Sequence, residues 1–261
     1  MVRGDIRMRI AETILLSLSR PVGSADPSKH RTEMRKRDPL ALLRQEYPEL
    51  NDILRGKRVV DFGSSLGLQS IALAREYGCT VRGIEINPKH LEKAVELARQ
   101  ESMPQVTFCF RVDEDMKGQY DVVISQNSME HYSDPGATLN EMASLVKPGG
   151  KILITFGPPW FAPYGSHMHF FCRVPWINLL FSERVVMNVR QRFRDDGAKR
   201  YEEVESGLNK MTVGKFERLI RQCGLHMERV GYTCVRRLNF LARMPLLREL
   251  FINHVTCVLT K

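Results

Sequence analysis

The sequence lacks the cysteine pattern of a metal or redox site. Its six cysteines stand at positions 79, 109, 172, 223, 234 and 257, and no two of them form a C-x-x-C pair. This spacing excludes the common zinc motifs and the thioredoxin-type redox motif. We therefore interpret the cysteines as free thiols in a reducing compartment, and we predict a cytoplasmic location.

Long hydrophobic runs are also missing. The apolar segment "RIAETILLSLS" near the N-terminus is shorter than the roughly 20 residues that a transmembrane helix needs. Hydrophobic residues make up 43% and charged residues 26% of the chain, which excludes a disordered or fibrous protein. The sequence therefore predicts a globular protein without a transmembrane segment.

The charge balance favours anionic partners but does not choose among them. The chain has 39 Lys and Arg against 30 Asp and Glu, which gives a net charge of +9. Nucleic acid, an acidic metabolite or a lipid surface would all fit this charge. The basic runs "KHRTEMRKR" and "VRQRFRDDGAKR" are interrupted by acids, and no nucleic-acid-binding motif is present, so we do not favour a nucleic-acid partner.

The pattern of apolar residues changes once along the chain. "MRIAETILLSLS" and "DPLALLRQEYPELNDILRG" have helical spacing, which predicts an N-terminal helical extension over residues 1–56. From residue 57 strands and helices alternate, which is typical of a parallel sheet with helices on both faces. We expect strands at 58–62, 80–86, 105–111, 120–125 and 150–156, and helices at 67–77, 88–101 and 136–146.

The C-terminal third completes this prediction. Residues 157–211 are rich in aromatics and form an insertion, after which "TVGKFERLIRQCGL" restores a helix. "HMERVGYTC" and "NHVTCVLTK" are expected to be strands around a short basic helical piece, "RRLNFLARMPLLREL". The predicted fold class is α/β: a doubly wound, Rossmann-like, mainly parallel seven-stranded sheet with an antiparallel last strand, formed by residues 57–261.

The stretch "VVDFGSSLGLQS", residues 59–70, has the features of a strand, a tight turn and a helix start. A dinucleotide fingerprint would need glycine where Ser65 and Leu68 stand, and a P-loop would need a lysine that the turn lacks. The turn is therefore not a phosphate-binding loop of either kind.

Carboxylates follow three of the expected strands. Asp61 ends the first strand, Glu85 comes about twenty residues later in "VRGIEINP", and Asp113 follows the third strand in "FCFRVDED". Three acids at neighbouring strand ends would repel a pyrophosphate. They suit a ligand with a ribose, an exocyclic amine and a positively charged head.

Taken together, these motifs resemble those of class I S-adenosylmethionine-dependent methyltransferases. "DFGSSLG", residues 61–67, is similar to the family's D-x-G-x-G-x-G motif with Ser65 in place of the middle glycine, and "YDVVISQNSMEHYSDPGATLNEMASLVKPGGKILITF" is similar to its later motifs. The resemblance covers residues 57–156 and implies S-adenosyl-L-methionine as the cofactor. The cofactor-binding residues that it implies are Asp61, Gly63, Ser64, Ser65, Gly67, Glu85, Ile86, Asp113, Glu114, Gln126 and Asn127.

Within this set the resemblance implies separate roles. Gly63 and Gly67 shape the loop around the methionine part, and Glu85 takes the ribose hydroxyls with Ile86 against the adenine. Asp113 accepts from the adenine amine. Gln126 and Asn127 lie beside the amino-acid part.

The candidate catalytic residues are His131, His167 and Tyr164. A hydroxyl acceptor needs a base, which histidine commonly supplies. By resemblance His131 lies near the reactive end of the cofactor, although a packing role at the helix start is equally open. His167 and Tyr164 belong to "GPPWFAPYGSHMHFF", in the insertion where this family builds its acceptor pocket. His167 and His169 form an H-x-H pair without a clustered third ligand, so we predict no metal site.

The same insertion contains a dense group of aromatic residues. They could line a pocket for a flat or apolar acceptor, or they could pack the insertion onto the sheet. "GPPW" follows the fifth strand rather than the fourth, so it is not the amine-orienting motif of nucleic-acid N-methyltransferases. The residues are Trp160, Phe161, Tyr164, Phe170, Phe171 and Trp176.

We therefore expect an enzyme that methylates a small-molecule acceptor, with oxygen favoured over nitrogen and carbon. Two alternatives stay open from the sequence. One is a modifier of a macromolecule or lipid surface, suggested by the charge. The other is a protein that binds the cofactor without transferring methyl, for example by catalysing its cyclisation. The sequence does not determine the acceptor or the oligomeric state.

Overall fold

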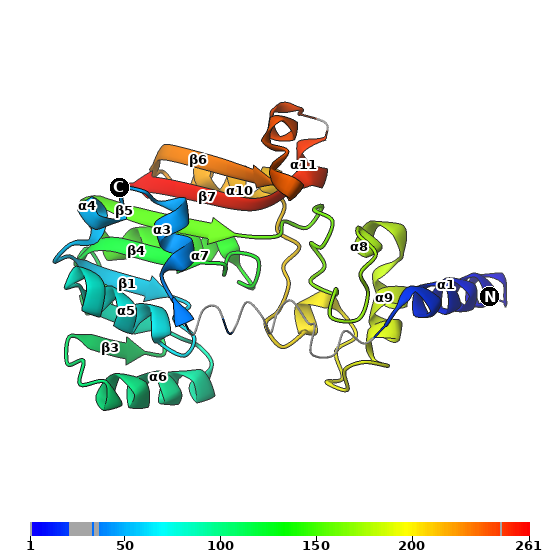
Figure 1. Cartoon of the computed structure of the whole chain (residues 1–261), viewed down its shortest axis with the longest axis horizontal. Coiled ribbons are helices and arrows are strands. Elements are labelled where there is room, and N and C mark those ends of the chain that lie inside the picture. The colour runs from blue at the N-terminus through cyan, green and yellow to red at the C-terminus, as the bar shows by residue number, and fades with distance from the viewer. Residues whose placement is uncertain (1, 21–32, 34–36, 246) are drawn as a thin grey trace.

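A computed structural model describes residues 2–20, 33, 37–245 and 247–261 (Figure 1). Seven strands form one sheet in the order β3-β2-β1-β4-β5-β7-β6. The first five are parallel, and β7 runs antiparallel between β5 and β6. The predicted fold class, with its antiparallel last strand, is confirmed. The strands are β1 (Arg58–Phe62), β2 (Thr80–Ile84), β3 (Val106–Cys109), β4 (Tyr120–Gln126), β5 (Val146–Phe156), β6 (His226–Cys234) and β7 (Ile252–Thr260).

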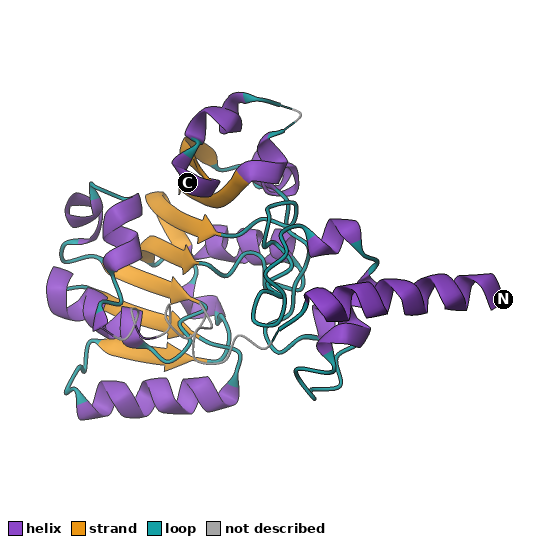
Figure 2. Ribbon diagram, turned by 45° about the vertical axis from the view of Figure 1, so that its right-hand side comes forward, coloured by secondary structure: helices purple, strands orange, loops and turns teal. Residues whose placement is uncertain are grey.

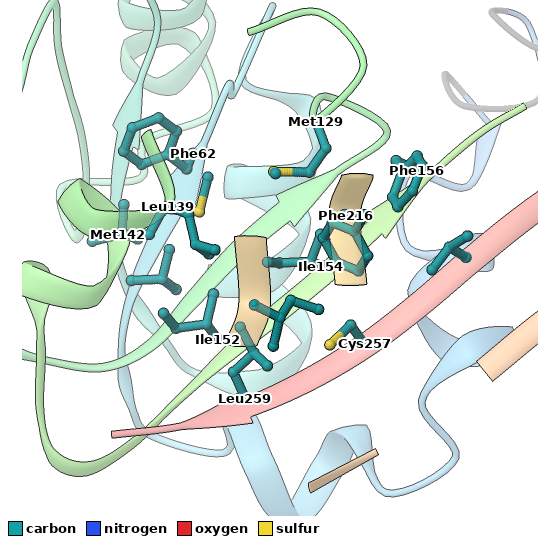
Figure 3. Close-up of a cluster of buried hydrophobic side chains, with 14 of the residues drawn as sticks. Phe62, Met129, Leu139, Met142, Ile152, Ile154, Phe156, Phe216, Cys257 and Leu259 are labelled. Atoms are coloured by element: carbon teal, nitrogen blue, oxygen red, sulfur yellow. The ribbon is translucent and has the colours of Figure 1, made fainter. Parts of the chain in front are cut away.

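Helices cover both faces of the sheet because successive strand residues point to opposite faces. In β1, Val59 joins the cluster beneath α5, while Val60 joins the cluster beneath α7 and α10. Figure 3 shows the second cluster, which contains Met142 of α7, Phe216 of α10 and Ile154 of β5. The flanking helices are α5 (Leu68–Tyr77), α6 (Pro88–Gln100), α7 (Pro135–Leu145) and α10 (Val213–Gln222).

The continuous helical pattern expected over residues 38–56 is divided into two helices, α3 (Ala41–Glu46) and α4 (Leu50–Leu54). The break falls at Tyr47, because the residue before a proline is disfavoured in helical conformation. Tyr47 is fully buried, and its hydroxyl donates to the carbonyls of Ile154 in β5 and Cys257 in β7 at 2.9 and 3.2 Å. These two helices are therefore fixed to the sheet itself.

The fifth strand begins earlier than the sequence predicted. β5 starts at Val146 rather than at residue 150, so α7 ends at Leu145. Val146 pairs with Tyr120, and the next pair joins Val122 to Lys151, so residues 147–150 bulge out of the ladder. Pro148 lies in this bulge, where a missing backbone N–H costs no ladder hydrogen bond.

The insertion after β5 has its own core, to which α1 (Val2–Leu18) belongs. The insertion contains α8 (Ile177–Leu180), α9 (Glu183–Arg190) and a 3₁₀ turn, η3 (Tyr201–Glu203). Leu15 of α1 is buried among its apolar residues, and Asn188 of α9 donates to Glu12 of α1 at 2.6 Å. α1 thus packs on the insertion, away from α3 and α4, and its N-terminal part projects from the body (Figure 2).

Between β6 and β7 the chain makes an excursion of short helical turns, as predicted from "RRLNFLARMPLLREL". They are η4 (Val235–Arg237), η5 (Asn239–Arg243) and α11 (Arg248–Phe251). A further 3₁₀ turn, η2 (Glu114–Met116), precedes β4. Within the described ranges, no helix has both the length and the hydropathy needed to cross a bilayer.

Candidate functional site

The parallel strands end at one edge of the sheet, on the side where α8 and α9 lie (Figure 1). Asp61 lies near the end of β1, Glu85 directly follows β2, and Gln126 ends β4. Because β1 pairs with both β2 and β4, these positions belong to neighbouring strand ends. Ligands of open α/β sheets bind at this kind of edge.

The turn after β1 is tight, and three of its residues have left-handed backbone conformations. Gly63, Ser65 and Gly67 have φ values of 81°, 50° and 78°. The amides of Gly63 and Ser64 donate to the carbonyl of Ile84 at 2.9 and 3.0 Å. A side chain at Gly63 would lie 3.0 Å from the Ser128 hydroxyl. The loop is therefore held closely between the ends of β2 and β4, and Ser65 adopts the conformation that glycine adopts most readily.

Asp61 lies beneath this loop and holds its helix start. Its Oδ1 accepts from Gln69 Nε2 at 2.7 Å, and its Oδ2 accepts from the Ser70 hydroxyl at 2.6 Å. The side chain is only 1% exposed, and this burial raises the pKa of Asp61 to about 6. Asp61 thus stabilises the loop and places a titratable acid under it.

Glu85 joins two loops. Its Oε2 accepts from the amide of Ser65 at 2.8 Å, and its Oε1 accepts from the amide of Asn87 at 2.7 Å. Each carboxylate oxygen has a second lone pair that these bonds leave available. The carboxylate can therefore hold both loops and still accept a pair of vicinal hydroxyls.

Beyond Glu85, two apolar side chains face solvent at this edge. Ile86 is 74% exposed and Phe110, after β3, is 49% exposed. Sequence reasoning missed Phe110, because an aromatic residue at a strand end has the same pattern as a core residue. Exposed apolar surface next to the Glu85 carboxylate suits a flat nucleobase.

Two acids of "VDED", Asp113 and Glu114, are predicted site residues, and both are exposed. Asp113 is exposed, 3.8 Å from Arg111, and Glu114 is exposed and paired with Lys117 at 2.6 Å. Glu114 therefore forms a surface ion pair. Asp113 precedes η2 and keeps its carboxylate accessible.

The end of β4 supplies an unused polar atom. Gln126 Oε1 is buried and has no hydrogen-bond partner among the described residues. Asn127 follows with a φ of 51°, and its amide donates to the Thr155 carbonyl at 2.8 Å. A buried acceptor without a donor is costly, so it fits a site that receives an ammonium or amide group from a ligand. The residues present therefore fit an S-adenosylmethionine molecule.

On the acceptor side, the structure brings His131 and His167 together. Their ring centroids lie 5.5 Å apart in an edge-to-face arrangement. His131 Nδ1 lies 2.7 Å from the carbonyl oxygen of Gly207. A carbonyl can only accept, so Nδ1 carries the hydrogen and Nε2 has the lone pair in the neutral ring. The insertion thus fixes the tautomer that a general base requires.

Asn209 holds the far end of the insertion against the loop after β4. Its Nδ2 donates to the carbonyls of Met129 and Tyr132, both at 2.7 Å, and its amide donates to the carbonyl of Glu130 at 3.0 Å. These bonds fix the position of Gly207 relative to His131. Sequence reasoning missed Asn209, since a lone asparagine in a loop gives no signal.

Tyr164 contacts a different part of the insertion. Its hydroxyl donates to the Arg173 carbonyl at 3.4 Å, and its ring packs on His169 with centroids 5.3 Å apart. His167 and His169 therefore face different neighbours. No group of three or more metal-ligating side chains gathers in the part of the chain that the structure describes. Of the insertion's aromatics, Phe171 is buried in the core formed with α1.

Comparisons with known proteins show the family of this chain. The sequence model of a family described as "Methyltransferase domain" matches residues 31–230. The 2-methyl-6-phytyl-1,4-hydroquinone methyltransferase of Synechocystis is 36% identical over 114 residues, which cover 42% of this chain and 35% of the relative. The ubiquinone biosynthesis O-methyltransferase of Xanthomonas euvesicatoria is 37% identical over 117 residues, 43% of this chain and 48% of the relative. The matched part thus spans about half the length of these curated relatives, or less.

Solved structures show the same fold. A sarcosine dimethylglycine methyltransferase from Galdieria sulphuraria superimposes with a TM-score of 0.55 at 18% identity, covering 88% of this chain and 85% of that one. Phosphoethanolamine N-methyltransferase 2 of Haemonchus contortus, solved with S-adenosyl-L-methionine, gives 0.55 at 19% identity, with 85% and 51% covered.

Proposed function

Because this chain belongs to the methyltransferase-domain family, whose class I fold uses S-adenosylmethionine, we propose that it methylates the hydroxyl oxygen of a small aromatic acceptor. The observation that supports oxygen is the hydrogen bond between His131 and Gly207. It leaves Nε2 of His131 free to accept a proton, which a hydroxyl acceptor must lose.

We assign each part of the cofactor to different residues at the strand ends. Glu85 would accept from the ribose hydroxyls, and Ile86 and Phe110 would offer apolar surface to the adenine. Gln126 Oε1 would accept from the ammonium of the amino-acid part. When bound, the cofactor would supply an electrophilic methyl carbon on its positively charged sulfur, and S-adenosylhomocysteine would leave as a neutral thioether.

His131 then removes the proton of the acceptor hydroxyl. Nε2 takes the proton, and the imidazolium that forms keeps its Nδ1–H bond to the Gly207 carbonyl. Asn209 keeps that carbonyl in place through its bonds to the loop after β4. Because the leaving group is already activated, the rate depends mainly on how well the protein positions the base and the acceptor hydroxyl.

The relatives of ubiquinone biosynthesis are named O-methyltransferases, which supports oxygen as the methylated atom, and the Synechocystis name supports an aromatic acceptor. The Synechocystis relative is named for a hydroquinone with a phytyl group, and the others are O-methyltransferases of ubiquinone biosynthesis. We transfer to this chain the shared chemistry, a ring hydroxyl next to apolar substituents.

The test is a product assay with purified protein, S-adenosylmethionine and a panel of water-soluble catechols, hydroquinones and amines. We expect S-adenosylhomocysteine and an O-methylated phenol by mass spectrometry. Methylthioadenosine as the product, or methylation of amines alone, would contradict the proposal. His131→Gln should lower kcat by about 10²–10⁴-fold with the Kd for cofactor unchanged.

His226→Gln is the matched control, because His226 is an exposed histidine at the start of β6 and not at the strand-end site. It should leave kcat unchanged. Full activity in the His131 variant would remove His131 from the mechanism.

A further inference from the structure

The excursion between β6 and β7, residues 235–251, exposes apolar side chains that no described element covers. Phe240 is 63% exposed, and Leu238, Met244 and Leu247 are also exposed. Burying side chains of this size is worth about 1.5–3 kcal/mol each, so a group of them in solvent marks a contact surface. We call these four residues, with the arginines described below, the excursion surface.

This exposure does not come from a poorly packed loop. Leu241, Ala242 and Phe251 of the same excursion pack against the main hydrophobic core. Asn239 Oδ1 accepts from the amide of Cys234 at 2.9 Å, which closes the excursion at its start. The excursion is anchored on one side, and its other side presents apolar residues outward.

Arginines surround these apolar residues. Arg236, Arg237 and Arg243 are exposed, and none of them takes part in an ion pair within the described ranges. The excursion's acid, Glu249, accepts from the amides of Val213 and Gly214 at the start of α10. The excursion surface therefore has a net positive charge that no neighbouring carboxylate neutralises.

The excursion lies on the same side of the molecule as the carboxyl ends of the parallel strands (Figures 1 and 2). The ring of Phe251 meets Trp176, which precedes α8, with centroids 6.1 Å apart. In α8, Leu180 is 65% exposed and Leu179 is also exposed. Apolar exposure thus continues from the excursion to the helix beside it.

From these observations we propose that the excursion surface docks the protein on an anionic phospholipid bilayer as a peripheral contact. The bilayer interface accepts both features at once: apolar side chains enter the acyl boundary, and arginines bind the phosphate headgroups. An ordinary protein interface is depleted of charge at its apolar centre, whereas here Arg237 adjoins Leu238 and Arg243 adjoins Met244 in the sequence. The proposal does not depend on the acceptor, although docking would bring the strand-end site near apolar acceptors dissolved in the membrane.

The experiment measures binding of the full chain to vesicles by flotation. We expect binding to phosphatidylcholine vesicles with about one third phosphatidylglycerol, weak binding to phosphatidylcholine alone, and weaker binding as salt rises. Leu238→Ser with Phe240→Ser should lower the affinity by about tenfold or more for lack of apolar insertion. Arg236→Gln with Arg237→Gln and Arg243→Gln should lower it by about a hundredfold on anionic vesicles.

Val95→Ser with Met227→Ser is the matched control, because both side chains are exposed and apolar but lie outside the excursion. It should bind vesicles as the unchanged protein does. Circular dichroism and cofactor affinity of each variant establish that the fold is intact.

Three results would overturn the proposal. The first is no binding to anionic vesicles. The second is binding that survives both excursion variants and is lost with Ile6→Ser and Ile10→Ser on the exposed side of α1. The third is a dimer in sedimentation that Phe240→Ser dissociates, which would make the surface an interface between copies. Transfer to a soluble hydroquinone is measured in parallel, so failure of the proposed activity is seen separately from failure to dock.

Discussion

The amide of Ser65 donates to Oε2 of Glu85 across 2.8 Å, which joins the turn after β1 to the end of β2. One carboxylate thereby fixes a loop and remains available to hydroxyl groups. Its replacement should change both the shape of the site and the affinity for the nucleoside.

Glu85→Ala should weaken binding of S-adenosylhomocysteine at least tenfold, because it removes the ribose acceptor and leaves the amides of Ser65 and Asn87 without partners. Calorimetry measures the change. Glu92→Gln, at an exposed acid of α6, is the control and should bind normally. An unchanged Kd for Glu85→Ala would exclude Glu85 from the ribose site.

The pKa of Asp61 predicts a pH dependence of stability. Burial raises it from 3.8 to about 6, so between these values the folded protein binds a proton that the unfolded chain does not. The stabilisation from this proton is complete below about pH 4 and is lost as the pH rises through about 6. Asp61→Asn should abolish that part of the slope, about 2–3 kcal/mol between the two limits.

Urea unfolding of both proteins from pH 4.5 to 8 measures this difference. The asparagine can keep its bonds to Gln69 and Ser70, since the Ser70 hydroxyl can accept as well as donate. The variant should therefore be as stable as the unchanged protein at pH 8, or more so. Parallel stability curves for the two proteins would mean that Asp61 does not titrate in this range.

Gly67→Ala should destabilise the fold by about 2–4 kcal/mol, for two reasons. The residue has a positive φ, and an added Cβ would lie 2.7 Å from the Phe108 ring and 3.0 Å from the Cβ of Ala94. Gly118→Ala is a matched control, because Gly118 also has a positive φ but nothing lies near its Cβ position. The difference between the two variants measures the contact with Phe108. Equal losses of stability in the two variants would show that the contact between the added Cβ and Phe108 costs no stability.

Tyr47→Phe should lower the free energy of unfolding by about 1–2 kcal/mol. The buried hydroxyl donates to carbonyls of two different strands, β5 and β7, and phenylalanine cannot replace either bond. Tyr164→Phe, which removes one long surface hydrogen bond, should change stability by less than about 0.5 kcal/mol. Chemical denaturation compares the two. A neutral Tyr47 variant would mean that the two hydrogen bonds of this hydroxyl do not contribute to stability.

The sheet and its strand-end residues were predictable because local patterns specify them. Strand alternation and the small residues around Gly63 placed Asp61 and Glu85 at neighbouring strand ends, where the structure has them. Ser65 illustrates a finer point: the motif predicts glycine, and the structure retains the backbone conformation of glycine at that serine.

The acceptor side was less predictable because it is built from long-range contacts. The pairing of His131 with Gly207 joins positions 76 residues apart, and Asn209 holds it in place. Likewise, no local pattern distinguishes α1, which packs on the insertion, from α3 and α4, which pack on the sheet. The sequence pattern around Phe110 is that of a core residue, whereas the side chain is 49% exposed.

The position of β7 between β5 and β6 has a consequence for synthesis on the ribosome. β6 is synthesised before β7, but it cannot join the sheet until β7 has paired with β5, because β7 lies between β5 and β6. During this interval β5, which is an interior strand of the finished sheet, has an unpaired edge that can pair with wrong partners. A nascent chain stalled after β6 should therefore bind chaperones that recognise extended apolar segments, and should release them once β7 has emerged.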